Sequence, residues 1–185
     1  MADDGTDGAG GCVDLTAPIS ERDHVEGDRN APVMLVEYGD YECPDCLNAW
    51  PIVKKLRQEM GDRMAFSFRH FPQTSIHPHA SAAAQAAEAA ASQGKFWEMH
   101  DVLFANQKRL ADLDMTHLAL SAGLEVYRFQ ADFERASHVN RIREDVESAT
   151  KSGVKGTPTF FINGCRYRGK VDVPTMLEAL RAVAS

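Results

Sequence analysis

Residues 33–46 read VMLVEYGDYECPDC, and this stretch decides the fold. Its first six residues, Val33 to Tyr38, form a near-continuous apolar run, which is typical of a strand buried on both faces. The pair Cys43 and Cys46 follows within a few residues. Beyond it, apolar residues recur at three- and four-residue spacings as far as Met60, which predicts a helix. A buried strand therefore leads into a Cys-x-x-Cys pair that opens a helix.

The rest of the chain predicts an α/β fold whose strands are separated by a block of helices. A second strand is expected over residues 64–68, and a right-handed crossover makes it parallel to the first. Residues 159–162 and 165–168 form a predicted hairpin, because Asn163-Gly164 is the strongest two-residue hairpin signal. Helical patterns cover residues 75–92, 96–104, 115–122, 126–136 and 140–151, and a last helix is expected over 174–183.

These elements divide the chain into four parts. Residues 1–30 are predicted to be a flexible N-terminal arm, because their Gly/Asp-rich start lacks the apolar content to order itself. Residues 31–73 hold the strand–helix–strand half of one domain. Residues 74–152 are an all-helical insertion, and residues 153–185 hold the hairpin–helix half of the same domain.

Composition and charge are those of an ordinary globular protein, with 44% hydrophobic and 25% charged residues. The net charge of −7 argues against a general nucleic-acid-binding surface, which needs clustered Lys and Arg. No run approaches the roughly 18 apolar residues needed to cross a bilayer, so no membrane span is predicted. We expect a monomer.

The N-terminus shows no basic segment followed by an apolar core, so no secretory signal is visible. If Met1 is the native start, the sequence predicts a cytoplasmic protein. If a signal has been removed ahead of it, the protein is exported.

The chain has four cysteines, Cys12, Cys43, Cys46 and Cys165, too few for a disulfide-stapled scaffold of this length. Two of them form the Cys-x-x-Cys pair, which points to redox chemistry or metal binding. We interpret Cys165 as a packed side chain in a hairpin strand and Cys12 as an incidental thiol. A disulfide between Cys12 and Cys165 is the alternative.

The position of the Cys-x-x-Cys pair favours chemical activity. A helix N-terminus presents unpaired N–H groups and the positive end of the helix dipole, which stabilise a thiolate and lower the pKa of the first cysteine. Pro44 suits the first helical position, where no intrahelical bond is lost. We therefore predict that Cys43 is the attacking nucleophile and Cys46, about one turn further on, the resolving thiol.

The alternative interpretation of the pair is half of a structural zinc site. Such sites usually show two closely spaced pairs of ligands. Here Cys12 and Cys165 are isolated, and His77 and His79 have no cysteine beside them. Redox chemistry is therefore favoured over metal binding, and we predict no metal ligands.

A second feature lies before the predicted strand at 159–162. Gly156-Thr157-Pro158-Thr159 places a proline at the strand entry, where most X–Pro bonds are trans and mark only a turn. In a dithiol enzyme, a cis proline here frees neighbouring backbone groups to pair with an extended substrate segment.

Residues 36–46, 68–72, 94–100 and 153–164 resemble segments of the DsbA-like family of thiol–disulfide oxidoreductases, within the thioredoxin superfamily. The resemblance extends over about residues 32–181. It implies a thioredoxin-like fold with an all-helical insertion between its two halves. It also implies an active dithiol at Cys43 and Cys46, faced by a cis Pro158 with Thr157 just before it, both bordering the bound substrate.

One departure from the family concerns the dipeptide between the cysteines, which is Pro44-Asp45 where familiar members have Pro-His or Pro-Tyr. A carboxylate repels a thiolate, and Glu42 and Asp40 add to the negative surroundings. We therefore treat Pro44, Asp45 and Glu42 as modulators of the site. The expected pKa of Cys43 is nearer the thioredoxin value of about 7 than the value of about 3.5 in strong oxidants, which predicts a weaker oxidant.

The predicted function is disulfide exchange with protein substrates, and a redox partner that the sequence does not identify recycles the dithiol. No organic cofactor is expected, because no dinucleotide or phosphate-binding fingerprint is present. The alternatives are a metal-binding or non-catalytic interaction module on the same scaffold, and a glutathione-linked enzyme of the same superfamily. His70, at a strand end, is interpreted as a structural histidine in preference to a proton shuttle.

Overall fold

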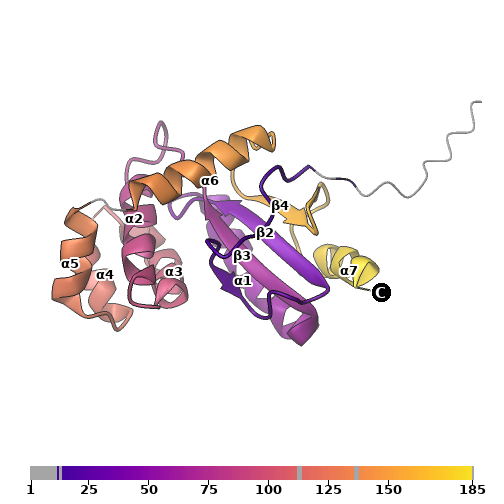
Figure 1. The fold of residues 1–185 in the computed structure, drawn as a ribbon, viewed down its shortest axis with the longest axis horizontal. Coiled ribbons are helices and arrows are strands. Elements are labelled where there is room, and N and C mark those ends of the chain that lie inside the picture. The colour runs from indigo at the N-terminus through magenta and orange to yellow at the C-terminus, as the bar shows by residue number, and fades with distance from the viewer. Residues whose placement is uncertain (1–11, 13, 112–113, 136–137, 185) are drawn as a thin grey trace, which may run out of the picture.

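The computed structural model describes residues 12, 14–111, 114–135 and 138–184 (Figure 1). Its strands are β1 (Val25–Glu26), β2 (Val33–Gly39), β3 (Met64–His70), β4 (Thr159–Ile162) and β5 (Cys165–Arg166). Its helices are α1 (Pro44–Met60), α2 (Ala80–Ala91), α3 (Phe96–Ala105), α4 (Met115–Ser121), α5 (Val126–Glu134), α6 (Val139–Lys151) and α7 (Val173–Val183). Two short 3-10 turns are η1 (Gly61–Arg63) and η2 (Gln107–Arg109).

The strands form one sheet in the order β1-β3-β2-β4-β5. β2 and β3 are parallel and joined by α1, as predicted, and β4 runs antiparallel to β2 with Thr159 opposite Tyr38. β2 is therefore interior to the sheet, which explains its near-continuous apolar sequence. Because β4 is antiparallel, its first residue lies at the edge where β2 ends. The segment after Gly39 and the segment before Thr159 consequently lie side by side.

Different elements cover the two faces of the sheet. On one face, Leu35 and Phe68 pack with Leu56 of α1 and Met176 of α7 in the main hydrophobic core. On the other face, a second apolar cluster joins the sheet to α6 and to the N-terminal segment, and it contains Leu15, Val36, Tyr38, Ala149, Val154 and Phe161.

The helices α2 to α5 gather beside the sheet, and α6 returns across it (Figure 1). Helix α2 is alanine-rich, and small side chains such as Ala83, Ala86 and Ala90 are completely buried, so neighbouring helices approach it closely. The fold is thus thioredoxin-like with a helical insertion between its two halves. The boundaries 31–73, 74–152 and 153–185 stay predictions. Within the described residues, no helix has both the length and the apolar character of a membrane span.

The start of α2 differs from the prediction. The sequence pattern places the helix start at Ser75, whereas α2 begins at Ala80 and residues 74–76 and 78–79 form turns. The reason is a set of side-chain contacts with the segment after β2. His77 Nδ1 bonds to Asp40, and both the backbone N–H and Nδ1 of His79 bond to Glu42.

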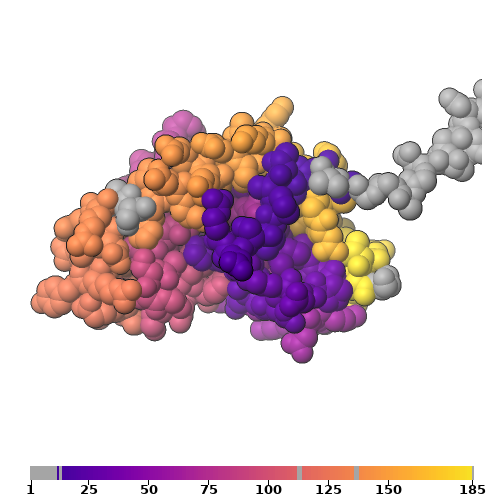
Figure 2. All heavy atoms as spheres, viewed as in Figure 1, coloured from indigo at the N-terminus to yellow at the C-terminus, as the bar shows by residue number. Residues whose placement is uncertain are grey.

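The prediction that residues 1–30 form a free arm is wrong for residues 14–30, while residues 1–11 and 13 lie outside the described residues. Figure 2 shows this segment lying across the sheet below α6. Leu15 is buried, and β1 pairs with β3. The apolar residues of this segment are isolated along the sequence, so they give no periodic signal. Their partners come from strands and helices far along the chain.

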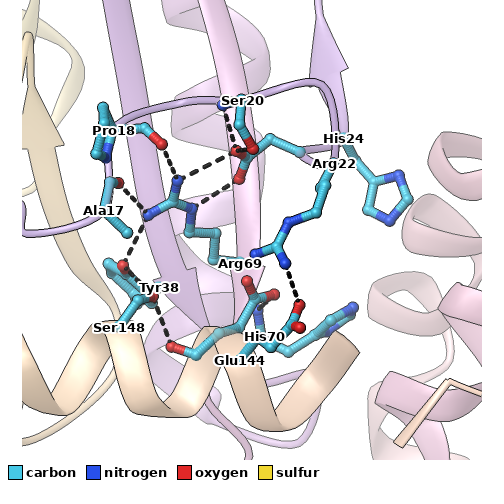
Figure 3. Close-up of polar contacts among 12 residues, drawn as sticks. Ala17, Pro18, Ser20, Arg22, His24, Tyr38, Arg69, His70, Glu144 and Ser148 are labelled. Atoms are coloured by element: carbon cyan, nitrogen blue, oxygen red, sulfur yellow. Dashed lines mark hydrogen bonds and ion pairs between the residues drawn. The ribbon is translucent and has the colours of Figure 1, made fainter. Parts of the chain in front are cut away.

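A buried ion pair fixes the same segment (Figure 3). Arg69 of β3 donates through Nε and Nη2 to the carboxylate of Asp23, at 2.7 and 3.2 Å. Its remaining N–H groups reach the carbonyls of Ala17 and Pro18 and the hydroxyl of Tyr38. Every donor of this guanidinium is therefore satisfied, and the burial of its charge is compensated.

Candidate active site

Cys43 occupies the N-cap of α1, and Pro44 is the first helical residue, as predicted. Cys43 is 6% exposed. The pKa of Cys43 is lowered to about 5, first by a hydrogen bond from the Cys46 thiol. The side chain of Thr157 and the backbone N–H groups of Cys46 and Asp45 lower it further, while burial opposes them. Near neutral pH the first sulfur is a thiolate.

Cys46 lies one turn further along α1 and is completely buried. Burial raises the pKa of its thiol well above the ordinary value, and the hydrogen bond that it donates to Cys43 raises it further. The N–H of Asp40 donates to the Cys46 sulfur at 3.5 Å. The two sulfurs are thus chemically unequal, with an ionised Cys43 and a protonated Cys46.

The segment before β4 forms the other wall of the site. The peptide bond between Thr157 and Pro158 is cis. The Cys43 sulfur lies 3.3 Å from the carbonyl oxygen of Thr157, to which it donates a hydrogen bond when it is protonated. Apart from the Cys43 sulfur, whose pKa it lowers, the buried Thr157 hydroxyl oxygen has no hydrogen-bond partner among the residues described, so it is available to donate to a Cys43 thiolate.

The acidic residues near Cys43 were expected to repel its thiolate and to keep its pKa at about 7, but the two nearest ones are paired with other groups. Asp40 is buried and accepts hydrogen bonds from the N–H groups of Glu42 and Gln73 and from His77. Glu42 is paired with His79 in the same way. The expected pKa of about 7 for Cys43 is therefore too high, because these carboxylates are engaged elsewhere and direct hydrogen bonds dominate at the sulfur.

Asp45 and Pro44 are both exposed at the start of α1. The backbone N–H of Asp45 contributes to lowering the pKa of Cys43, and this contribution does not depend on the carboxylate. The roles of Pro44, Asp45 and Glu42 as modulators stay predictions.

Glu37 is a functional candidate that the sequence interpretation missed. It is 2% exposed, and its Oε1 atom has no hydrogen-bond partner within the part of the chain described. Burial raises the pKa of Glu37 to about 8, and the negative charge at Cys43 contributes. Glu37 in turn raises the pKa of Cys46, so the two groups interact. The available signal was an acidic residue inside a strand that is otherwise apolar.

Gln107 of η2 was also missed. Its side-chain amide is buried and donates to the backbone carbonyls of Tyr41 and Cys43, at 2.9 and 2.8 Å. The helical insertion therefore holds the segment that carries Cys43. No sequence pattern links a glutamine 64 positions away to that carbonyl.

The remaining candidates have structural contacts. His70 is buried, and its Nε2 atom lies 2.9 Å from Glu88 Oε1, in agreement with the structural interpretation. Cys12 and Cys165 lie next to each other, away from Cys43. Among the residues described, no group of three or more His, Cys, Asp or Glu side chains is placed to hold a metal ion.

A family model described as Thioredoxin matches residues 20–182, which is most of the chain. The chain belongs to the thioredoxin superfamily. Within that superfamily, the structure resembles a thioredoxin-like oxidoreductase from Silicibacter pomeroyi, with 27% identity and a TM-score of 0.75 over 90% of this chain and 95% of the other. Wolbachia pipientis alpha-DsbA1 has the same fold, with 20% identity and a TM-score of 0.78 over 94% of this chain and 96% of the other. The fold of this thioredoxin-superfamily chain is therefore DsbA-like.

Curated relatives of this thioredoxin-superfamily chain are much longer. A protein named Na(+)/H(+) antiporter NhaA 3, from Salinispora tropica, is 46% identical over 173 residues, which is 93% of this chain and 26% of the relative. The chain spans about a quarter of the length of the curated relatives it matches. The matched part corresponds to the domain described here.

Proposed function

We propose that this chain is a thiol–disulfide oxidoreductase that exchanges disulfides with protein substrates through Cys43 and Cys46. The observation that carries the proposal is the inequality of the two sulfurs. Cys43 has its pKa lowered to about 5, whereas the pKa of Cys46 is raised well above its ordinary value. This is the arrangement that disulfide exchange needs, with one good leaving thiolate and one resolving thiol.

In the oxidised enzyme, a substrate thiolate attacks the Cys43 sulfur and the Cys43–Cys46 bond breaks. The two electrons of that bond leave with Cys46 as a thiolate, and a mixed disulfide joins Cys43 to the substrate. A second substrate thiolate then attacks the substrate sulfur, and Cys43 leaves as a thiolate. The substrate has lost two electrons and two protons, and the enzyme dithiol has gained two electrons. The low pKa of Cys43 favours this last departure.

Glu37 suits the proton transfer at Cys46. A Cys46 thiolate formed inside the protein has no water to stabilise it, because the side chain is completely buried. With a pKa of about 8, Glu37 is largely protonated near neutral pH and can give its proton to Cys46. In the reverse direction its carboxylate accepts the proton of Cys46 as that thiol attacks.

The proposed substrate site begins at Thr157 and Pro158. An open groove of about 550 Å³ continues from Pro158 along β4 and the hairpin, and Lys155, Arg166 and Arg168 contribute to its wall. The chain as a whole carries a net charge of −7, so this positive groove differs in sign from the protein around it. We propose that the groove receives an extended substrate segment and favours acidic residues beside the substrate cysteine.

The proposed redox strength lies between the two extremes of the superfamily. A thiolate pKa of about 5 lies between about 3.5 for strong oxidants and about 7 for thioredoxin. We therefore propose a dithiol that is less oxidising than a strongly oxidising DsbA. We propose thiol exchange for this chain and not the antiport named in those relatives, because the matched region is about a quarter of their length.

Variants of the two cysteines test the proposal. With Cys12 and Cys165 changed to serine, the chain should reduce or oxidise a peptide disulfide catalytically, and Cys43→Ser should abolish that turnover. Cys46→Ser should instead accumulate a mixed disulfide with the peptide at Cys43, visible by intact mass. Equal activity of the Cys43→Ser variant would contradict the proposal. Stable binding of zinc in place of exchange would favour the metal-binding alternative, and exchange with glutathione alone would favour a glutathione-linked enzyme.

A further inference from the structure

The chain contains a second pair of thiols that the proposed reaction does not use. Cys12 and Cys165 are distant in sequence, yet the Cys165 thiol donates to the carbonyl oxygen of Cys12 at 2.7 Å. The Cys165 side chain is also close enough to raise the pKa of the Cys12 thiol. Both are free thiols in the structure, one exposed and one half-buried.

The backbone on either side keeps this pair in register. The N–H groups of Asp14 and Leu15 both donate to the carbonyl oxygen of Gly164, at 3.1 and 2.9 Å. In return, the N–H of Arg166 donates to the Asp14 carboxylate at 3.1 Å. These bonds place Cys12 next to Cys165. The closeness of Cys12 and Cys165 is therefore a consequence of the hydrogen bonds on either side of them.

The pair lies at the end of the sheet opposite to the active site. Cys165 is opposite Ile162, which pairs with Leu35 near the start of β2, whereas the active site follows the end of β2. Cys43 therefore cannot reach these thiols within the same molecule, and a bond between them leaves the Cys43–Cys46 dithiol free to react.

We propose that Cys12 and Cys165 form a second disulfide, which fastens the N-terminal segment to the hairpin of β4 and β5. The oxidant is a low-molecular-weight disulfide such as glutathione disulfide. One cysteine thiolate attacks it and releases one glutathione thiolate. The second cysteine then attacks the first cysteine's sulfur, which forms the Sγ–Sγ bond and releases the second glutathione. The two cysteines lose two protons and two electrons, and the glutathione disulfide becomes two thiols.

The fastened segment covers one face of the sheet. Leu15 packs with Val36 and Phe161 there, and the segment continues to the buried Asp23–Arg69 ion pair. Figure 2 shows the segment lying between α6 and the β4 region. The proposed disulfide therefore holds the N-terminal segment in place over the second apolar cluster.

The test uses the full chain with Cys43→Ser and Cys46→Ser, so its outcome does not depend on the proposed exchange activity. After equilibration with glutathione disulfide, free thiols are blocked with iodoacetamide and the intact mass is measured. We expect a mass two daltons below that of the reduced chain, no alkyl groups, and one cross-linked peptide containing Cys12 and Cys165. Two alkyl groups, two glutathione adducts or a disulfide-linked dimer would each overturn the proposal.

A matched control and a stability readout complete the test. Adding Cys165→Ser should leave Cys12 open to one alkyl group or one glutathione. Forming the bond should raise the Tm by roughly 5–15 °C, because it closes most of the chain into a loop. It should also slow trypsin cleavage after Arg22 about tenfold or more. An unchanged Tm with an unchanged cleavage rate would show that the bond does not fasten the segment.

Discussion

The Sγ atom of Cys43 lies 3.3 Å from the carbonyl oxygen of Thr157, although 114 positions separate the two residues in sequence. The contact follows from the sheet, because β4 is antiparallel to β2 and starts where β2 ends. The helical insertion lies between these segments in sequence and leaves their pairing intact. The reactive sulfur is consequently positioned by both halves of the thioredoxin-like fold.

Replacing Thr157 by valine tests whether its side chain stabilises the Cys43 thiolate. The wild-type thiolate, followed by absorbance near 240 nm, should titrate with a midpoint of about 5. Thr157→Val removes a hydroxyl that can donate to the thiolate, so the midpoint should rise by about half a unit to one unit. Thr116→Val, on α4, serves as the matched control and should leave the titration midpoint unchanged. A midpoint that stays near 5 in Thr157→Val would show that the Thr157 hydroxyl does not stabilise the thiolate.

Replacing Glu37 by glutamine tests its protonation in the folded state. Folding raises the pKa of this carboxyl from 4.5 to about 8. The folded state therefore binds the proton more tightly, and the resulting stability is present below pH 4.5 and lost as the pH rises through about 8. In Glu37→Gln this loss, on the order of several kcal/mol, should be absent from the free energy of unfolding.

Urea unfolding between pH 5 and 9 measures this effect, in a Cys43→Ser background so that the thiolate does not titrate; there burial alone keeps the pKa of Glu37 raised. Glu178→Gln, at an exposed position of α7, is the control and should keep the wild-type pH dependence. Identical pH profiles for wild type and Glu37→Gln would mean that Glu37 is ionised in the folded protein at neutral pH.

Reversing two charges tests the proposed substrate groove. Lys155→Glu with Arg168→Glu should lower kcat/KM about tenfold for a disulfide peptide with acidic flanks, since each exposed pair contributes up to about 1 kcal/mol. The effect should shrink in high salt. A neutral peptide should be little affected. The control is Arg143→Glu with Lys151→Glu, on α6. An equal loss of kcat/KM in both double variants would mean that the net charge of the protein, and not the groove, causes the effect.

Replacing Arg69 by methionine tests the buried ion pair. It removes the main cationic partner of the Asp23 carboxylate and leaves only Ser20 and the more distant Arg141, so the free energy of unfolding should fall by about 3 kcal/mol. Adding Asp23→Leu should restore most of that loss, because both charges are then gone. Urea unfolding curves give both values. An Arg69→Met variant as stable as wild type would show that the ion pair of Asp23 and Arg69 does not hold the N-terminal segment.

The sequence predicts the parts of this fold that are local. The β2–α1 unit, the hairpin at Asn163-Gly164 and the order of the helices follow from hydrophobic period and turn chemistry. The reactive cysteines are predictable for the same reason, since strand, Cys-x-x-Cys and helix are contiguous. The helix start at Ala80 was missed because distant carboxylates, Asp40 and Glu42, hold the preceding turns.

The parts that depend on distant contacts were not predictable. The N-terminal segment is ordered by Arg69 and by the second apolar cluster, which the segment's own residues do not reveal. The acidic residues near Cys43 predict too high a pKa for its thiol, because the pairing of Asp40 with His77 and of Glu42 with His79 is visible only in three dimensions. Gln107 reaches Cys43 from the insertion for the same reason.

The equilibrium reduction potential of the Cys43–Cys46 pair tests the central claim most directly. It is measured in glutathione buffers on the full chain with Cys12 and Cys165 changed to serine. A thiolate pKa of about 5 predicts a two-electron transition at about −200 mV, between about −120 mV for strong oxidants and about −270 mV for thioredoxin. A value at or below about −270 mV, or no two-electron transition, would contradict a dithiol whose thiolate is stabilised by its surroundings.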